Sequence, residues 1–515
     1  MRHKPAIDAL VGLSLCFAGL PRSGGTPGSV FGVVHLPTSR SHPSPPRIAV
    51  LALLAATWVG LLVTGSSALA HTYAPTRLGD PVPNGCKRNE CSLREAVIAA
   101  NNRSGDDDIV LKAGKTYKLS QGADSTGEDL ARSGDLDIRD KVTIASSGKT
   151  KAIVDANNHF RVFETFAATA LRRLKVKRGS TIGEDPGGLL FGGGLYSNNG
   201  GRTTIVRCAF TGNSSAAVVA GTAHVSISRS SISGNMQDGA RAVSALSVSR
   251  STISNNGQTG LSALGGELTV SRSTVAGNSP GVYVASVDVP TTITRSTIRG
   301  NSSEGGSSGG IEVSLGTLSV SRSTVSGNKA TGANANGGGI QVSQGTATLI
   351  NDTIDGNHAE LAGGGIYALY TSTVTMNAVT IAHNEADSDG NTIGDGGGIA
   401  TDGTSTFSTK NSLIARNTAA TGTPPDCSGT AASDGQNLLT SDNSGCPGFT
   451  GPADFLSVTA ANLNLGTLRS NGGPTKTDAL GRGSRAINHA GGDAPKLDQR
   501  GIRRVNPDIG AFERR

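Results

Sequence analysis

A short motif recurs along the middle of the chain and constrains its fold more than any other feature. In residues 249–256, Ser-Arg-Ser-Thr-Ile-Ser-Asn-Asn, an apolar residue lies three positions before the final Asn, and this ending occurs nine times. The copies end at intervals of 21 to 33 residues, at Asn213, Asn235, Asn256, Asn278, Asn301, Asn328, Asn357, Asn384 and Asn417. A period of this length is typical of a solenoid, in which each repeat forms one coil.

Two apolar positions in each repeat predict the path of that coil. One lies three residues before the Asn, as at Ile253, and another lies eight before it, as at Val248; the second position fails only at Thr409. Side chains of a strand alternate between its two faces, so residues five apart cannot both point inward from one unbroken strand. A corner must separate them, which predicts a parallel β-helix whose strands stack about 4.8 Å apart. We expect each Asn to adopt a left-handed corner conformation and to bond along the axis.

A second marker, Gly-Gly-Gly-Ile, recurs toward the C-terminus at 337–340, 363–366 and 396–399. We expect it to open another inward-facing strand, with longer loops on one face where insertions precede these glycines. The 72 glycines and the abundant Val, Ile and Thr exclude a helical bundle and favour strands.

Residues 1–70 have a different composition and are predicted to be a leader. Arg47 precedes an apolar run from residue 48 to 63, and Ala68-Leu69-Ala70 follows as a small-residue cleavage site. This order describes a secretory signal peptide cleaved after Ala70, with residues 1–39 a mis-assigned start. The alternative is a membrane anchor, but the run is short for a span. We therefore expect a secreted protein without a stable membrane span.

Removal of the leader changes both charge and cysteine content. Five basic residues and one acidic residue leave, so the net charge falls from +7 to +3 and gives no argument for nucleic acid. An oxidising compartment permits disulfides. We predict Cys86–Cys91 and Cys427–Cys446, with Cys208 a buried free thiol.

The two ends carry motifs that resemble known families. Residues 91–96, Cys-Ser-Leu-Arg-Glu-Ala, predict a capped amphipathic helix through Ser92 and Glu95. They match the signature of the CSLREA domain of secreted bacterial β-helix proteins, and residues 134–144 and 161–165 continue the resemblance. Residues 471–480, 484–491, 498–504 and 508–513 resemble the choice-of-anchor Q domain. The resemblance implies a right-handed, pectin-lyase-like β-helix and little chemistry, because these families are defined by architecture. We expect an N-terminal cap at 71–105, the β-helix at 106–420 and a loop-rich C-terminal cap at 421–515.

One repeat position is arginine in six successive copies. Stacked about 5 Å apart, such charges cost each neighbouring pair on the order of 1 kcal/mol even in water. They must be solvated, splayed or neutralised by an anion. Two interpretations follow: an exposed polar corner, or a rail for an extracellular polysaccharide or cell-surface polymer. The residues are Arg207, Arg229, Arg250, Arg272, Arg295 and Arg322.

Two further groups of polar residues are candidate sites. Asp387, Asp389, Asn391 and Asp395 have spacings reminiscent of a Ca²⁺ loop, although the Gly is misplaced and position twelve is Gly398. No other cofactor is expected, and a plain polar loop is the alternative. For catalysis, the repeat at 351–358 combines Asp352, Asp355 and His358. Asp352 is expected to point inward and be capped by neighbouring serines, and Asp355 outward, so we assign no catalytic residue.

The leading functional prediction is a secreted, non-enzymatic β-helix that acts as an adhesion or polysaccharide-binding scaffold. The alternative is a polysaccharide lyase or glycoside hydrolase of the pectin-lyase-like superfamily. Trp58, the only Trp, is lost with the leader, which weakens an aromatic sugar-binding platform.

Overall fold

The computed structural model describes residues 70–122, 130–181, 192–198, 200–332 and 334–515. The predicted signal peptide therefore lies outside the described residues, apart from Ala70. No helix within the described ranges is both long enough and apolar enough to cross a membrane.

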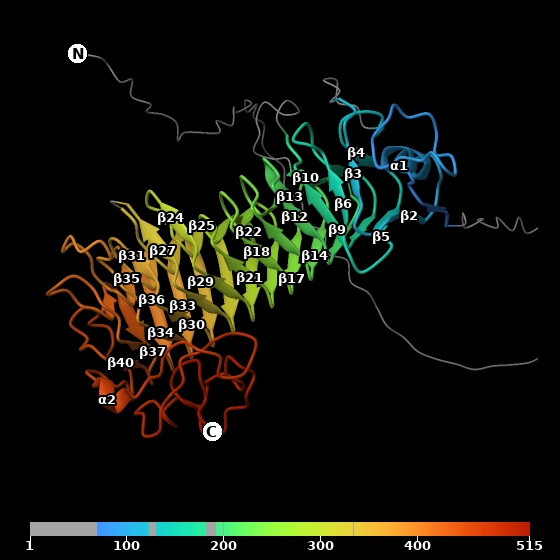
Figure 1. The fold of residues 1–515 in the computed structure, drawn as a ribbon. Coiled ribbons are helices and arrows are strands. Elements are labelled where there is room, and N and C mark those ends of the chain that lie inside the picture. The colour runs from blue at the N-terminus through green and yellow to red at the C-terminus, as the bar shows by residue number, and fades with distance from the viewer. Residues whose placement is uncertain (1–69, 123–129, 182–191, 199, 333) are drawn as a thin grey trace, which may run out of the picture. The chain divides into compact units, whose positions relative to one another are not determined.

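The described chain winds into stacked coils, and most coils contribute strands to three faces (Figure 1). All strand pairs are parallel and join successive coils, as the sequence period predicts. The first face follows the Gly-rich marker, and its Ile340, Ile366 and Ile399 open strands as expected. Its strands are β4 (Leu136–Ile138), β7 (Phe163–Thr165), β10 (Gly192–Ser197), β13 (Ala216–Ala220), β16 (Ala240–Ala242), β19 (Leu261–Leu264), β22 (Val282–Thr294), β25 (Ile311–Ser321), β28 (Ile340–Ser343), β32 (Ile366–Leu369), β35 (Ile399–Thr401) and β38 (Cys427–Ser428).

The second face carries the inward residue that lies eight positions before each Asn. Strands β22 and β25 are long enough to serve the first and second faces together. The other strands are β1 (Thr72–Tyr73), β2 (Asp107–Leu111), β5 (Val142–Ser146), β8 (Thr169–Arg172), β11 (Thr203–Val206), β14 (Val225–Ser228), β17 (Leu246–Ser249), β20 (Leu268–Ser271), β29 (Gly345–Ile350), β33 (Thr373–Asn377), β36 (Thr406–Lys410) and β39 (Ala431–Ser433).

The third face carries the inward residue that lies three positions before each Asn. Its strands are β3 (Thr116–Lys118), β6 (Ala152–Asp155), β9 (Leu174–Lys177), β12 (Ala209–Thr211), β15 (Ser231–Ser233), β18 (Thr252–Ser254), β21 (Thr274–Ala276), β23 (Thr297–Arg299), β26 (Thr324–Ser326), β30 (Thr353–Asp355), β34 (Thr380–Ala382), β37 (Leu413–Ala415) and β40 (Leu438–Leu439). Three short strands form a small separate sheet in the loops that follow: β24 (Ser302–Glu304), β27 (Lys329–Thr331) and β31 (His358–Ala359).

The core fills the inside of the coils with stacked apolar side chains. Both repeat positions point inward: Ile227 pairs in register with Val248, and Ile232 pairs with Ile253, all of them fully buried. Burial of one such side chain stabilises the fold by about 1.5–3 kcal/mol. Thr409, the exception in the sequence pattern, also points inward and bonds to Asn437.

The nine repeat asparagines form a continuous ladder inside the coils, which confirms the predicted bonding along the axis. Each Nδ2 donates to the Oδ1 of the next coil's Asn at 2.7 to 3.1 Å, from Asn213 to Asn417, where Asp426 accepts the last bond. The expected left-handed conformation of these residues is wrong. It belongs to the preceding residue, which is Gly in six of the nine coils, as at Gly234 with φ +65°. The Asn side chain must point into the core, so the residue before it takes the turn.

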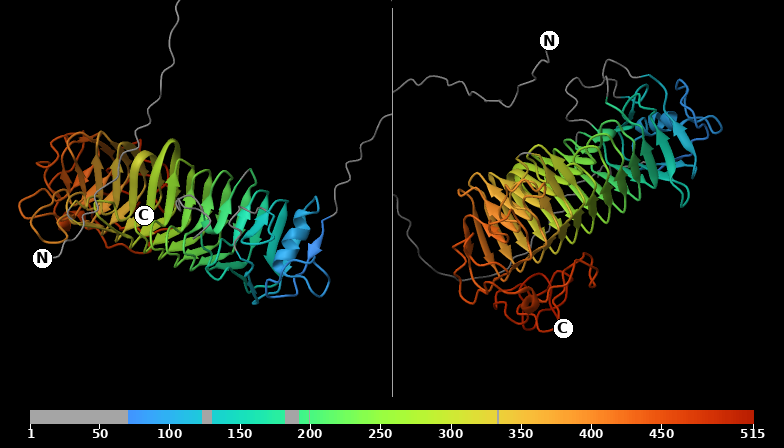
Figure 2. Two further views of the ribbon diagram at one scale, coloured as in Figure 1. Left: turned by 90° about the horizontal axis from the view of Figure 1, so that it is seen from above. Right: turned by 60° about the vertical axis from the view of Figure 1, so that its left-hand side comes forward.

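The two ends of the coil are built differently. At the N-terminus, α1 (Leu93–Asn101) has the predicted capping box, with both the Ser92 and Glu95 bonds present. At the C-terminus, strand pairing continues through β38, β39 and β40, so the coil extends past residue 420. The segment beyond contains α2 (Ala460–Leu463) and then doubles back along the outside of the later coils (Figure 2). Gln499 bonds there to Thr353 and Thr324 of the third face.

Candidate functional site

The repeat arginines occupy the corner between the second and third faces. Each follows a second-face strand and has φ between +47° and +56°, in the left-handed region. The backbone N–H of Arg250 donates to the carbonyl of Ser271 in the next coil, and the other arginines repeat this bond. The ladder of backbone bonds therefore runs through the corner and holds the arginines at the spacing of the strands, about 4.8 Å.

Register also adds a seventh arginine. Val206 pairs with Arg172, so Arg173 occupies the corner of the preceding coil, with φ +55°. The sequence pattern missed it because this coil has no repeat Asn to anchor the alignment. The arginine ladder, as used below, is Arg173, Arg207, Arg229, Arg250, Arg272, Arg295 and Arg322. The corner continues as Asn351, Ala378 and Asn411.

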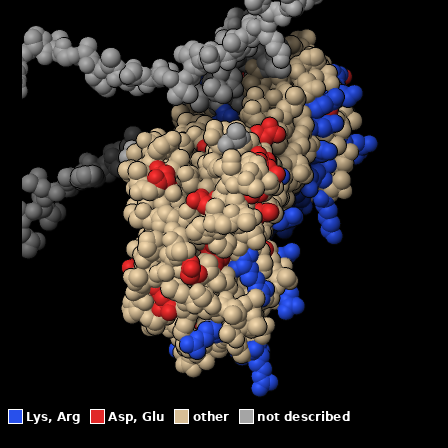
Figure 3. Space-filling view, turned by 90° about the vertical axis from the view of Figure 1, so that its left-hand side faces the viewer, with Lys and Arg blue, Asp and Glu red and all other residues tan. Residues whose placement is uncertain are grey.

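The side chains of the arginine ladder face solvent without acidic partners. Within the described residues, none of the seven forms an ion pair with a carboxylate, and Arg173 donates only to the carbonyl of Gly148. Four of them, Arg207, Arg229, Arg250 and Arg272, are exposed, and the others are half-buried. Lys and Arg gather along one edge of the molecule in Figure 3, whereas acidic residues are scattered over the face turned toward the viewer.

A groove runs beside three members of this ladder. Its volume is about 250 Å³, and its lining consists of Ser249, Arg250, Ser271, Arg272, Thr294 and Arg295. The hydroxyl residues come from the outward positions of the second face. Guanidinium forks therefore alternate with hydroxyl groups at a fixed pitch. Such a surface can bind carboxylate, sulfate or phosphate groups and donate hydrogen bonds to sugar hydroxyls.

The residue that follows each ladder arginine points inward and forms a second ladder, made mostly of serines. Each Ser Oγ accepts from the backbone N–H of the previous coil at 3.0 to 3.2 Å and donates to the carbonyl two residues earlier. The serine ladder comprises Ser230, Ser251, Ser273, Ser296 and Ser323, with Cys208 before it and Asp352 after it. Cys208 is a buried free thiol, as predicted, and burial raises its pKa to about 11. It is therefore poorly reactive.

The three catalytic candidates of the sequence do not form one site. Asp352 is fully buried and accepts from the backbone N–H groups of Ser323 and Ile350 at 2.7 and 2.8 Å. It therefore points inward as expected, although its partners are amides instead of serine hydroxyls. Burial raises its pKa well above the usual range. His358 of β31 bonds through Nδ1 to Glu385 of the next coil, and both side chains are partly exposed. Asp355 bonds to a different residue, His383.

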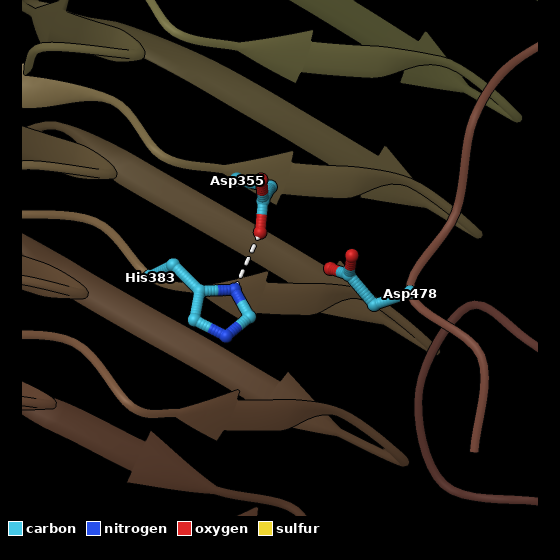
Figure 4. Close-up of side chains that lie close together, drawn as sticks. All are labelled: Asp355, His383 and Asp478. Atoms are coloured by element: carbon cyan, nitrogen blue, oxygen red, sulfur yellow. Dashed lines mark hydrogen bonds and ion pairs between the residues drawn. The ribbon is translucent and has the colours of Figure 1, made fainter. Parts of the chain in front are cut away.

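Asp355 points out of the coil, as expected, but the C-terminal segment covers it. Its Oδ2 lies 2.7 Å from Nδ1 of His383, the residue after β34 in the next coil (Figure 4). Asp478 of the C-terminal segment points toward this pair, and the ligand atoms of the three residues lie within 4.8 Å of one another. Burial, and next the carboxyl of Asp355, raise the pKa of Asp478 well above its usual range. Sequence periodicity carries no signal for this cluster, because Asp478 comes from outside the repeats.

The predicted calcium loop is bonded to itself and to its neighbours. Asp387 accepts from the N–H of Thr392, Asp389 from the side chain of Asn391, and Asp395 from the hydroxyl of Ser428. Two groups of three or more His, Cys, Asp or Glu bring their ligand atoms within 4.8 Å in the described part of the chain, and neither includes these residues. Calcium binding by this loop stays a prediction.

The end motifs have structural partners. Arg94 of the CSLREA-like motif is fully buried, pairs with Asp80 at 2.9 Å and donates to four carbonyls between Ala131 and Asp135. In the C-terminal segment, Arg504 pairs with Glu513 and donates to Asn351 of the coil. The disulfides Cys86–Cys91 and Cys427–Cys446 are both present, as predicted. These motifs hold the two ends onto the coil.

Comparison with known proteins agrees with this architecture. The model of a family described as the right handed beta helix region matches residues 193–354 and, in an overlapping second match, residues 281–444. The chain is a right-handed parallel β-helix. The matched ranges lie between the two end segments of this β-helix. Its resemblance to the CSLREA and choice-of-anchor Q domains therefore stays a prediction.

Two solved structures are similar to this β-helix in fold. The crystal structure of pectate lyase Pel9A is 15% identical with a TM-score of 0.33, covering 88% of this chain and 98% of that one. The A-module of the Azotobacter vinelandii mannuronan C-5 epimerase AlgE4 is 14% identical with a TM-score of 0.30, covering 75% and 100%. A shared fold does not transfer an activity. No curated protein matched this chain.

Proposed function

We propose that this β-helix is an extracellular scaffold that binds an anionic polymer along its arginine ladder, without catalysis. The observation that carries the proposal is the row of seven exposed or half-buried arginines held in register, none of them paired with a carboxylate of the described residues. The two disulfides support an oxidising, extracellular location.

The backbone of the corner supports a role for the arginine side chains. A left-handed conformation costs about 1–2 kcal/mol for most residues and is adopted readily by Gly or Asn. The same corner is Asn in two later coils, at Asn351 and Asn411. Arginine therefore gives the turn no conformational advantage. Its positive charge becomes favourable at this corner only when an anion is bound. A regular row of charges suits a polymer with regularly spaced acidic groups better than a small molecule.

The alternative, a polysaccharide lyase or hydrolase, needs acid and base groups that converge on one bond. Asp352, Asp355 and His358 instead bond to three different sets of partners. The test of this alternative is incubation with anionic polysaccharides and measurement of new reducing ends or unsaturated products. Turnover would contradict the non-enzymatic proposal.

Binding is tested with a variant in which Arg250, Arg272 and Arg295 are all changed to Asn, the residue that this corner already uses. We expect affinity for an immobilised polyuronate or sulfated polysaccharide to fall about 10- to 100-fold, because each exposed charge contact contributes up to about 1 kcal/mol. Wild-type affinity should fall steeply with salt, since exposed charges are screened within about 10 Å at 0.1 M.

The control variant changes Lys112, Lys115 and Lys118 to Ser. These three lysines are exposed and lie at an early coil, and the variant loses the same charge as the arginine variant. It should keep nearly wild-type affinity. Equal losses of affinity in the two variants would show that net charge alone causes the effect. Unchanged binding in the arginine variant would exclude the arginine ladder as the site.

A further inference from the structure

We propose that Asp355, His383 and Asp478 form a binding site for a divalent transition metal, with Zn²⁺ as its best match. The site joins two adjacent coils to the C-terminal segment and would fasten that segment to the third face. Asp355 ends β30, His383 follows β34, and Asp478 lies in the segment that doubles back (Figure 4).

Asp478 is the observation that points to a ligand. Asp478 is 1% exposed, and neither of its carboxylate oxygens accepts a hydrogen bond from the described residues, although the carboxyl of Asp355 lies close enough to share a proton with it. A buried carboxylate without partners is costly, so its charge needs a cation or a proton. Arg416 lowers that cost through its positive charge, but its two Nη atoms donate to the carbonyls of Leu465 and Ala460.

Asp355 increases the need for a cation. Its side chain is nearly buried, and its carboxylate faces both His383 and Asp478. Two carboxylates and one imidazole in contact provide two anionic oxygens and one nitrogen. Zn²⁺ binds this donor set at about 2.0–2.2 Å, whereas Ca²⁺ prefers oxygen ligands alone. The partly exposed His383 leaves an approach from solvent.

His383 is also an unusual residue for its corner. It has φ +56°, and six other coils have Gly at this position. The turn alone therefore does not require an imidazole. A second acidic group, formed by Asp135, Asp137 and Glu164, differs because Arg161 contacts both Asp135 and Glu164. It already contains a positive charge.

The experiment uses the full chain without a polyhistidine tag, stripped with EDTA and titrated with ZnCl₂. We expect measurable binding by calorimetry, a higher melting temperature with zinc, and slower amide hydrogen exchange around residues 477–480. Ca²⁺ should not replace Zn²⁺. Asp478→Asn and His383→Gly should each weaken zinc binding about 10-fold or more. His383→Gly is expected to fold because Gly is already common at this corner.

The matched control is Asp389→Asn, which makes the same chemical change in the exposed loop and should keep wild-type zinc binding. Absence of zinc binding in the wild type would overturn the proposal. So would binding that survives in both Asp478→Asn and His383→Gly. A proton shared by Asp355 and Asp478 gives a different result: Asp478→Asn would stabilise the metal-free protein, and zinc would have no effect on the wild type.

Discussion

At the scale of single residues, Asp352 is the member of the serine ladder that should respond to pH. Its pKa in the folded chain is raised by burial, against the field of Arg322 and two amide hydrogen bonds. The folded state thus favours the protonated form. Its contribution to stability is complete below the unfolded pKa of about 3.9 and is lost as the pH rises through the folded pKa.

Asp352→Ser should therefore raise stability at neutral pH and flatten its dependence on pH above about 4. Serine also restores the side chain that the neighbouring coils use to accept the amide bond. The measurement is the denaturant midpoint of both proteins between acid and neutral pH. Ser323→Ala is the contrasting control, because it leaves the N–H of Ser296 without its partner, at a cost of about 1–3 kcal/mol. Lower stability of Asp352→Ser at neutral pH would mean that the charged carboxylate is needed.

At the scale of elements, the buried Arg94 of α1 joins the helix both to Asp80 in the preceding segment and to the first coils. Arg94 is 0% exposed and Asp80 is nearly buried, and the guanidinium also fixes the carbonyls of residues 131–135. Arg94→Ala leaves the buried Asp80 carboxylate without its cation, with only the N–H groups of Ser120 and Gln121 still donating to it. Breaking a buried ion pair in this way typically costs about 3–5 kcal/mol. We expect the loss to appear as faster exchange and proteolysis of residues 71–140 while the later coils stay protected. Arg88→Ala changes an exposed residue nearby and should alter neither the exchange nor the proteolysis of residues 71–140. Equal rates in the two variants would argue against attachment of α1 by Arg94.

At the scale of the whole molecule, the repeat predicts what is periodic and misses what is not. The repeat from Asn213 to Asn417 predicts both the coil and the hydrogen-bonded Asn ladder along its axis, because a stack of similar coils makes the same contact at each level. The position of the turn was mistaken, since the spacing of Ile253 and Asn256 does not say which intervening residue takes positive φ. Arg173 was missed where the Asn anchor is absent. Asp478 meets Asp355 only because the C-terminal segment docks on the third face, and no local pattern encodes that docking.

The same periodicity predicts that one whole coil can be removed. Deletion of residues 235–255 joins Gly234 to Asn256, so the Asn ladder and all three faces stay in register. The deleted coil takes Asp238 and its partner Arg241 together, which leaves no unpaired charge from that ion pair, and it shortens the arginine ladder by Arg250. Because each coil of a solenoid contacts only its neighbours, stability is close to a sum of coil and interface contributions. The shortened chain should therefore fold, with unchanged circular dichroism per residue and a smaller m-value in denaturant.

Binding of the shortened chain to the anionic polymer should weaken by less than tenfold and depend less steeply on salt, as expected when one charge contact is lost. Aggregation of the shortened chain would show that the coils are not interchangeable, and complete loss of binding would place the ligand on the deleted coil instead of along the ladder.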